Sequence, residues 1–140
     1  MRTSAVRYVF VYGTLRRGQV NDINRLQPAP VFLGTTRIQG VLFDLGAYPG
    51  LTLGGRTWVL GEVYAIEPAL ERQLDVIEAV APTPSGEYQR REVVLHLNGR
   101  ALPCLLYEIN PAVVIGRPRV QGGDWVAARH QSLPSSHRPG

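Results

Sequence analysis

The sequence contains no lysine, since all 15 of its basic residues are arginines. Schiff-base and pyridoxal-phosphate enzymes need a lysine amine that forms the covalent adduct. A P-loop nucleotide site needs a lysine that neutralises the β- and γ-phosphates. The absence of lysine therefore excludes these three kinds of site.

Cysteine and long hydrophobic runs are also scarce. The single cysteine, Cys104, cannot form an internal disulfide, which suits a reducing compartment. No apolar run approaches the ~20 residues that a membrane-spanning helix needs. The N-terminal MRTSAVR has no hydrophobic segment of the kind found in secretory signals. We therefore expect a cytoplasmic protein that does not contact a membrane.

The sequence offers few residues for metal or nucleophilic chemistry. His96, His130 and His137, taken with Cys104, do not have the spacing of a zinc ligand set. Cys104 lies in the apolar stretch ALPCLLYEI, which indicates a buried structural thiol rather than a nucleophile. No serine lies in a G-x-S-x-G motif. We expect no metal and no cofactor.

The net charge of +4 arises mainly near the C-terminus. Residues 109–140 carry four arginines and one aspartate, whereas residues 1–108 carry eleven arginines and ten acidic residues. This basic region leaves nucleic-acid binding as a rival function, but no aromatic residues alternate with the arginines to support it. We therefore do not expect a nucleic-acid partner.

Hydrophobic and turn patterns predict one α+β domain, since 140 residues suffice for a single core. One convincing helix is expected over Pro68–Ala79, with proline at its first position. A short helix is expected over Asn21–Leu26, capped by Asn21 or Asp22. The expected strands are Tyr8–Tyr12, Val31–Leu45 (one long strand, or two short ones broken near Gly40), Trp58–Ile66, Tyr88–Leu97 and Arg100–Ile109.

This order is not an alternating βαβ pattern, so we expect a mostly antiparallel sheet that curls around the core. Asn98-Gly99 predicts a two-residue hairpin turn. Loops are expected over Gly46–Arg56, which is rich in glycine, and over Ala81–Glu87. The domain is expected to span residues 1–128, followed by a disordered tail over residues 129–140.

The first strand runs into an abrupt turn with the sequence YGTLRRG. Gly13 to Gly18 has the glycine spacing of a phosphate loop, but Gln19 and Val20 stand where lysine and serine or threonine belong. Two interpretations stay open. In the first, the glycine only lets the chain turn. In the second, the backbone N–H groups of residues 13–15 are unpaired and can bind a carboxylate or an oxyanion. Arg16 and Arg17 are expected to be solvated, and the alternative is that they steer a substrate carboxylate.

Several short segments resemble the gamma-glutamyl cyclotransferase-like family, in particular its gamma-glutamylamine cyclotransferase branch with small bacterial-type members. The resemblance covers Tyr8 to Trp125. It is carried by several segments in the family's order: VYGTLRRG, LGAYPGL, LGEVYAI, LDVIEAV, EYQRREV, CLLYEI and GDW.

The resemblance implies a small β-barrel with short helices and an enzyme that converts gamma-glutamyl amides or amines into 5-oxoproline and the free amine. It places the catalytic acid/base at Glu78 of LDVIEAV. It also implies a small gamma-glutamyl substrate held by the YGTL-type loop, with further pocket residues nearby. These substrate-binding residues would be Tyr12, Gly13, Thr14, Leu15, Tyr48 and Tyr88.

Helix geometry gives Glu78 a partial test. At about 100° per residue, Leu70, Leu74 and Ile77 form one stripe and Glu78 lies about 80° from Leu70, at the margin of that stripe. A carboxylate there can be partly desolvated, which raises its pKa. Glu71 fits almost as well, and an ordinary solvated Glu78 is the alternative. Ala79 stands where the family often has glycine.

Other residues have more ordinary interpretations. Glu62 in LGEVY is expected to be structural, pairing with an arginine, although it could flank the pocket. Tyr48-Pro49-Gly50 is either a plain turn or a pocket wall. A non-catalytic binding module of the same fold is the main alternative to an enzyme. The sequence leaves the oligomeric state and the identity of the released amine open.

Overall fold

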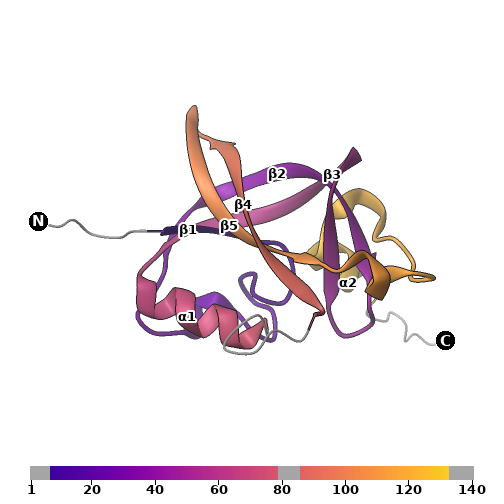
Figure 1. Ribbon diagram of the computed structural model, residues 1–140, viewed down its shortest axis with the longest axis horizontal. Coiled ribbons are helices and arrows are strands. Elements are labelled where there is room, and N and C mark those ends of the chain that lie inside the picture. Colours follow the sequence, from indigo (N-terminus) through magenta and orange to yellow (C-terminus); the bar gives the residue numbers. More distant parts are fainter. Residues whose placement is uncertain (1–6, 79–85, 133–140) are drawn as a thin grey trace, which may run out of the picture.

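The computed structural model of the protein describes residues 7–78 and 86–132 (Figure 1). The described elements are β1 (Arg7–Val11), η1 (Ile23–Arg25), β2 (Val31–Asp44), β3 (Pro49–Ile66), α1 (Pro68–Ile77), β4 (Tyr88–Leu97), β5 (Arg100–Ile109), η2 (Pro111–Val114), η3 (Gln121–Gly123) and α2 (Trp125–Ser132). Five of these are strands and two are α-helices, so the predicted α+β class is confirmed. None of the described helices is long and apolar enough to cross a bilayer.

The five strands form one sheet in the order β2-β3-β1-β5-β4. The β1–β5 pair is parallel, whereas the β1–β3, β2–β3 and β4–β5 pairs are antiparallel. The expected barrel is not confirmed, because among the described strands β2 and β4 are left as edges of an open sheet. The sheet nevertheless curls, since Thr36 Oγ1 on β2 donates to the His96 carbonyl on β4 at 3.0 Å.

The glycine-rich segment Gly46–Arg56 was expected to be a loop, and that prediction is wrong. Only residues 45–48 form the turn, and β3 begins at Pro49. β3 pairs with β2 along two stretches that are separated by a register shift. Gly40 of β2 lies opposite Leu53, whereas the adjacent Gln39 lies opposite Trp58. The residues between Leu53 and Trp58 bulge outwards, and Gly54 and Gly55 have the positive φ angles that this bulge needs.

The other predicted elements agree with the structure within a few residues. The helix predicted over Pro68–Ala79 is α1, with Pro68 in its first turn. The hairpin prediction for β4 and β5 is confirmed, and Asn98 and Gly99 both have positive φ. The loop expected over Ala81–Glu87 lies mostly outside the described residues.

The core has two apolar clusters on opposite faces of the sheet, because successive side chains of a strand point to opposite sides. Val9 and Val11 of β1 pack with Leu70 and Leu74 of α1 on one face. Phe10 and neighbouring side chains pack with Trp125 on the other face. Trp125 begins α2, which continues to Ser132. Residues 129–132 are therefore helical rather than disordered, and residues 133–140 of the expected tail lie outside the described residues.

Candidate active site

A cavity of about 280 Å³ opens where β1 ends. Several described parts of the chain meet there: the end of β1 with its following loop, the β2–β3 turn, the end of α1, the start of β4, and Tyr107 of β5. Its lining residues are Phe10, Val11, Tyr12, Gly13, Thr14, Leu15, Val20, Asn21, Ala47, Tyr48, Pro49, Ile77, Glu78, Glu87, Tyr88 and Tyr107. All seven residues that the sequence analysis assigned to the site lie in this set.

The loop after β1 is held in shape by its carbonyl groups and by a close contact with Pro49. The carbonyls of Gly13, Thr14 and Leu15 each accept a backbone hydrogen bond from further along the loop, at 2.9–3.0 Å. A Cβ atom on Gly13 would lie 2.5 Å from Pro49 Cγ, so only glycine fits there. The N–H groups of residues 13–15 have no acceptor among the described residues.

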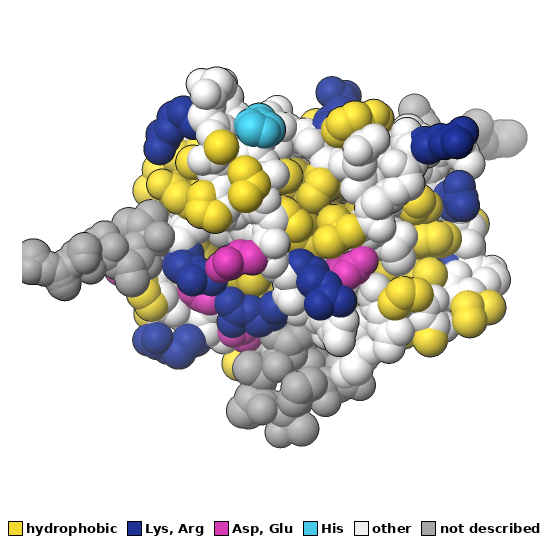
Figure 2. All heavy atoms as spheres, turned by 45° about the horizontal axis from the view of Figure 1, so that its top comes forward, with side chains coloured by type: hydrophobic (Ala, Val, Ile, Leu, Met, Phe, Trp, Pro, Cys, Tyr) yellow, Lys and Arg dark blue, Asp and Glu magenta, His cyan; other side chains and the backbone are white. Residues whose placement is uncertain are grey.

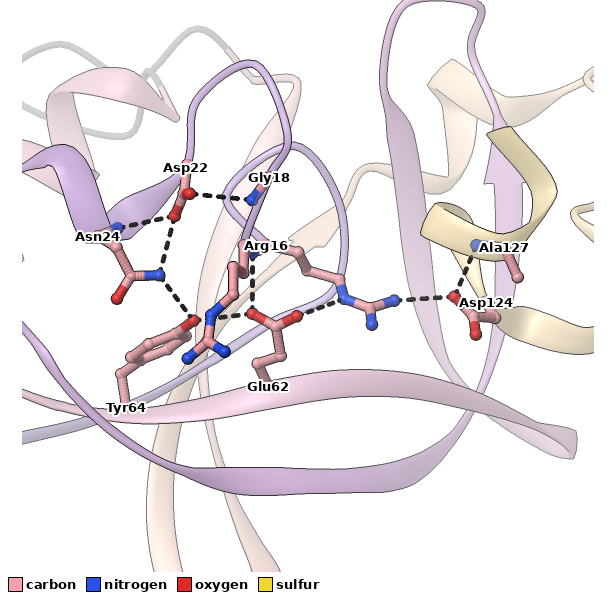
Figure 3. Close-up of polar contacts among 9 residues, drawn as sticks. Arg16, Gly18, Asp22, Asn24, Glu62, Tyr64, Asp124 and Ala127 are labelled. Carbon is pink, nitrogen blue, oxygen red and sulfur yellow. Dashed lines mark hydrogen bonds and ion pairs between the residues drawn. The ribbon is translucent and has the colours of Figure 1, made fainter. Parts of the chain in front are cut away.

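Arg16 anchors this loop to the sheet and to α2 (Figure 3). Its guanidinium donates from Nε to Glu62 Oε2 at 3.0 Å and from Nη1 to Asp124 Oδ1 at 2.9 Å. The side chains of Arg16 and Glu62 are each 9% exposed. The prediction that Arg16 is solvated is therefore wrong, whereas the prediction that Glu62 pairs with an arginine is confirmed.

The second oxygen of Glu62 extends this network. Glu62 Oε1 accepts from the backbone N–H of Arg17 at 3.0 Å and from the Tyr64 hydroxyl at 2.8 Å. Asn24 Nδ2 donates to the same hydroxyl, and its backbone N–H donates to Asp22 Oδ1 (Figure 3). Asp22, rather than Asn21, is thus the cap of the short helix η1. The network therefore holds the loop that lines the cavity, although Glu62 itself is not a lining residue.

Glu78 is the residue at which α1 ends, and it differs from the other carboxylates of that helix. Glu71 pairs with Arg7 and Arg90, and Asp75 with Arg90 and the Tyr107 hydroxyl. Glu78 has no ion pair among the described residues. Burial raises the pKa of Glu78 from its ordinary value near 4.5 to about 7, and the negative charge of Glu87 adds to this rise.

The tyrosines of the cavity use their hydroxyl groups to hold its walls together. Tyr12 donates to the Tyr107 carbonyl at 2.6 Å and accepts from the Leu51 N–H at 3.2 Å. Tyr88 donates to the Pro49 carbonyl at 2.7 Å. Burial raises the pKa of Tyr12, Tyr88 and Tyr107 well above the usual range, so these phenols stay neutral. They can shape the site but cannot act as phenolate bases near neutral pH.

Tyr48 and Glu87 connect two walls of the cavity. The Tyr48 hydroxyl, from the β2–β3 turn, donates to Glu87 Oε2 at 2.5 Å. Tyr48 and Pro49 therefore form a wall of the cavity, which decides between the two interpretations of that segment. The sequence analysis missed Glu87, Asn21 and Tyr107. The alternating pattern of β5 places Tyr107 on the same face as Leu105, but no local signal marks Glu87 or Asn21.

Cys104 agrees with its structural interpretation. Cys104 is fully buried in β5, and burial raises the pKa of its thiol to about 11. Such a thiol is a poor nucleophile. Within residues 7–78 and 86–132, no group of three or more histidine, cysteine and acidic side chains could hold a metal ion.

Comparison with known proteins identifies the family. Residues 9–127 match the family model described as "Gamma-glutamyl cyclotransferase, AIG2-like". The chain belongs to this family. Curated members include a protein of Vibrio cholerae, 43% identical over 72 residues, and one of Halalkalibacterium halodurans, 33% identical over 93 residues. Both carry the printed name "Putative gamma-glutamylcyclotransferase". The matches cover 51% and 64% of this chain and 62% and 80% of those proteins.

Solved structures share the fold. An AIG2-like protein from mouse has a TM-score of 0.73 at 26% identity, over 95% of this chain and 99% of that chain. The protein ytfP from Escherichia coli has a TM-score of 0.58 at 31% identity, over 85% of this chain and 96% of that chain. The cavity that begins at YGTL thus lies in a gamma-glutamyl cyclotransferase-like fold.

Proposed function

We propose that the protein is a gamma-glutamyl cyclotransferase, which cyclises a gamma-glutamyl amide or amine to 5-oxoproline and releases the amine. The observation that carries this proposal is Glu78, a carboxylate with a pKa of about 7 in a cavity that it shares with residues 13–15. A group with this pKa can both accept and return a proton near neutral pH. Family membership supplies the reaction class.

Glu78 acts first as a base and then as an acid. Its carboxylate accepts a proton from the α-ammonium group of the substrate, which frees an electron pair on that nitrogen. The nitrogen attacks the γ-carbonyl carbon and closes a five-membered ring, with an oxyanion on the former carbonyl oxygen. Glu78 then gives the proton to the departing nitrogen as its bond to carbon breaks and the carbonyl forms again. The ring nitrogen gives up its second proton to the Glu78 carboxylate, which passes it to the released amine, so the amine leaves as an ammonium ion and the ring keeps one N–H. No covalent protein intermediate forms.

The rest of the cavity orients the substrate. The backbone N–H groups of residues 13–15 are suited to bind the α-carboxylate or the developing oxyanion, since they have no acceptor among the described residues. Tyr12, Tyr48 and Tyr88 shape the pocket around the glutamyl chain. Because the attack is intramolecular, holding the chain in a folded conformation supplies much of the rate enhancement.

The test is an assay of 5-oxoproline after incubation with a panel of gamma-glutamyl amino acids, peptides and amines. We expect turnover of at least one compound and a loss of at least about 100-fold in kcat for Glu78→Gln, since this substitution removes the proton acceptor. Glu67→Gln is the matched control, because Glu67 is exposed at the other end of α1.

Two outcomes contradict the proposal. Full activity of Glu78→Gln would show that Glu78 is not the base, although the proposed reaction would still stand. Thermal stabilisation by a gamma-glutamyl compound without any 5-oxoproline would favour a non-catalytic binding module of the same fold. On the face shown in Figure 2, the basic side chains at the centre lie beside acidic ones, whereas basic side chains near the rim do not.

A further inference from the structure

The described lining of the cavity is acidic. Its described lining includes two carboxylates, Glu78 and Glu87, and no arginine, lysine or histidine. Arg117 is close enough to act on Tyr48, but it does not line the cavity. A site of this kind attracts a cation from solution.

We propose that Glu87 binds the α-ammonium group of the substrate while Glu78 takes its proton. This inference rests on the proposed function and adds a binding residue to it. The two carboxylates then have different roles, since Glu87 binds the ammonium group and Glu78 accepts its proton. The chemical class that fits is an α-amino acid zwitterion, whose carboxylate reaches the N–H groups of residues 13–15 while its ammonium group reaches Glu87.

The position of Glu87 is fixed from three sides, which suits a binding residue. The Tyr48 hydroxyl donates to its Oε2 atom at 2.5 Å. Its backbone carbonyl accepts from the Asn110 N–H at 2.7 Å, and the Asn110 side chain donates to the neighbouring Gly86 carbonyl at 2.9 Å. The hydrogen bond to Glu87 raises the pKa of Tyr48, which keeps that hydroxyl a donor.

Electrostatics between the two carboxylates favour a bound cation. The charge of Glu87 contributes to the raised pKa of Glu78, so the two groups repel each other when the cavity is empty. An ammonium group near both of them relieves this repulsion. It also favours the ionised form of Glu78, which is the form that accepts the proton. Substrate binding and activation of the base are therefore coupled.

The experiment compares two ligands that differ only in the ammonium group. L-glutamine has it, and glutaramic acid is the same molecule without its α-amino group. Binding is measured by calorimetry at pH 7.5 in the full-length Glu78→Gln protein, where turnover is blocked. We expect Glu87→Gln in this background to weaken L-glutamine binding by about 10-fold or more and to change glutaramic acid binding by less than about 2-fold.

Two further variants serve as controls. Glu92→Gln removes one exposed carboxylate outside the cavity and should change neither affinity. Tyr48→Phe keeps the charge of Glu87 but removes its donor, so we expect a smaller loss for L-glutamine alone. Tyr48→Phe also provides a second measurement if Glu87→Gln does not fold, as judged by circular dichroism.

The outcomes separate this inference from the proposed function. Equal losses for both ligands, no loss for L-glutamine, or no binding of L-glutamine to the Glu78→Gln protein would overturn the role of Glu87. If the wild-type protein forms no 5-oxoproline but the ligand difference is observed, the proposed reaction fails and the zwitterion site stands. If turnover is observed, Glu87→Gln should raise KM more than it lowers kcat.

Discussion

At the scale of single residues, Glu78 differs from the other acidic side chains of its helix because it has no ion pair among the described residues. Helix periodicity leaves Glu71 and Glu78 almost equivalent, since both lie near the margin of the apolar stripe. The structure separates them, because Glu71 pairs with Arg7 and Arg90, whereas Glu78 has no ion pair among the described residues. These partners come from β1 and β4, which are distant in the sequence. Periodicity along one helix therefore cannot reveal the difference.

The raised pKa of Glu78 predicts a pH-dependent cost in stability. Its pKa is about 7 in the folded protein and near 4.5 otherwise, so between these values the folded state holds a proton that the unfolded state has lost. Stability therefore falls as the pH rises through this window. We expect Glu78→Gln to be more stable than the wild type by about 1–3 kcal/mol at pH 8 and equally stable near pH 4.5.

Urea denaturation at pH 4.5 and pH 8 measures this difference, with Glu67→Gln as the exposed control. A stability difference that is the same at both pH values would show that Glu78 does not titrate with a raised pKa. The measurement needs no substrate, so it tests the electrostatics of the site separately from the proposed reaction.

At the scale of elements, the loop between β1 and η1 is shaped by a buried ion-pair network rather than by its own sequence. YGTLRRG indicates a turn, but two adjacent arginines in a loop ordinarily indicate solvated charge. Their different surroundings are decided by residues far along the chain. Arg16 meets Glu62 of β3 and Asp124 before α2, whereas Arg17 lies over the Phe32 ring at 4.8 Å.

Removing Arg16 should therefore destabilise the protein strongly. Arg16→Met leaves Glu62 buried without its cation, and we expect a loss of about 3–5 kcal/mol in the free energy of unfolding. Replacing both partners by methionine should recover most of that loss, because no buried charge is then left unpaired. Arg37→Met is the matched control, since Arg37 is exposed and has no ion pair among the described residues. An equal effect of Arg16→Met and Arg37→Met in urea denaturation would contradict the role of the network.

The glycine-rich segment marks another limit of local sequence patterns. Glycine and proline predict a loop over residues 46–56, yet residues 49–53 pair with β2. Glycine is needed at position 50 because the Ile109 side chain packs against it. A Cβ atom on residue 50 would lie 2.7 Å from Ile109 Cβ. Tertiary packing thus overrides the low strand propensity of glycine.

At the scale of the whole molecule, the C-terminal segment completes the core. The sequence after Asn110 has no clear periodicity, so α2 was not predicted. Trp125 is 1% exposed and belongs to the apolar cluster on the face opposite α1. Asp124, just before it, joins the Arg16 network. The end of the domain is therefore tied both to the core and to the loop that forms the cavity.

The two tryptophans of the chain provide a matched test of this arrangement. Trp125→Ala should destabilise the protein by about 3–5 kcal/mol, because it leaves a large cavity in the core. Trp58 is 51% exposed on β3, and Trp58→Ala should cost less than about 1.5 kcal/mol. Urea denaturation followed by far-ultraviolet circular dichroism measures both. Similar costs for the two variants would mean that α2 does not belong to the cooperative core.

The sequence by itself determined the features that depend on neighbours along the chain: α1 with its initial proline, the β4–β5 hairpin at Asn98-Gly99, the turn after β1, and the motifs that indicate the family. The tertiary structure alone decided that Glu71 is paired with arginine whereas Glu78 has no ion pair among the described residues. It also decided that the sheet stays open, that Trp125 fills the core, and that Glu87 lines the same cavity as Glu78. The physical reason is the distance along the chain over which each effect acts. Backbone conformation follows largely from adjacent residues, whereas desolvation and charge depend on whatever the fold brings close.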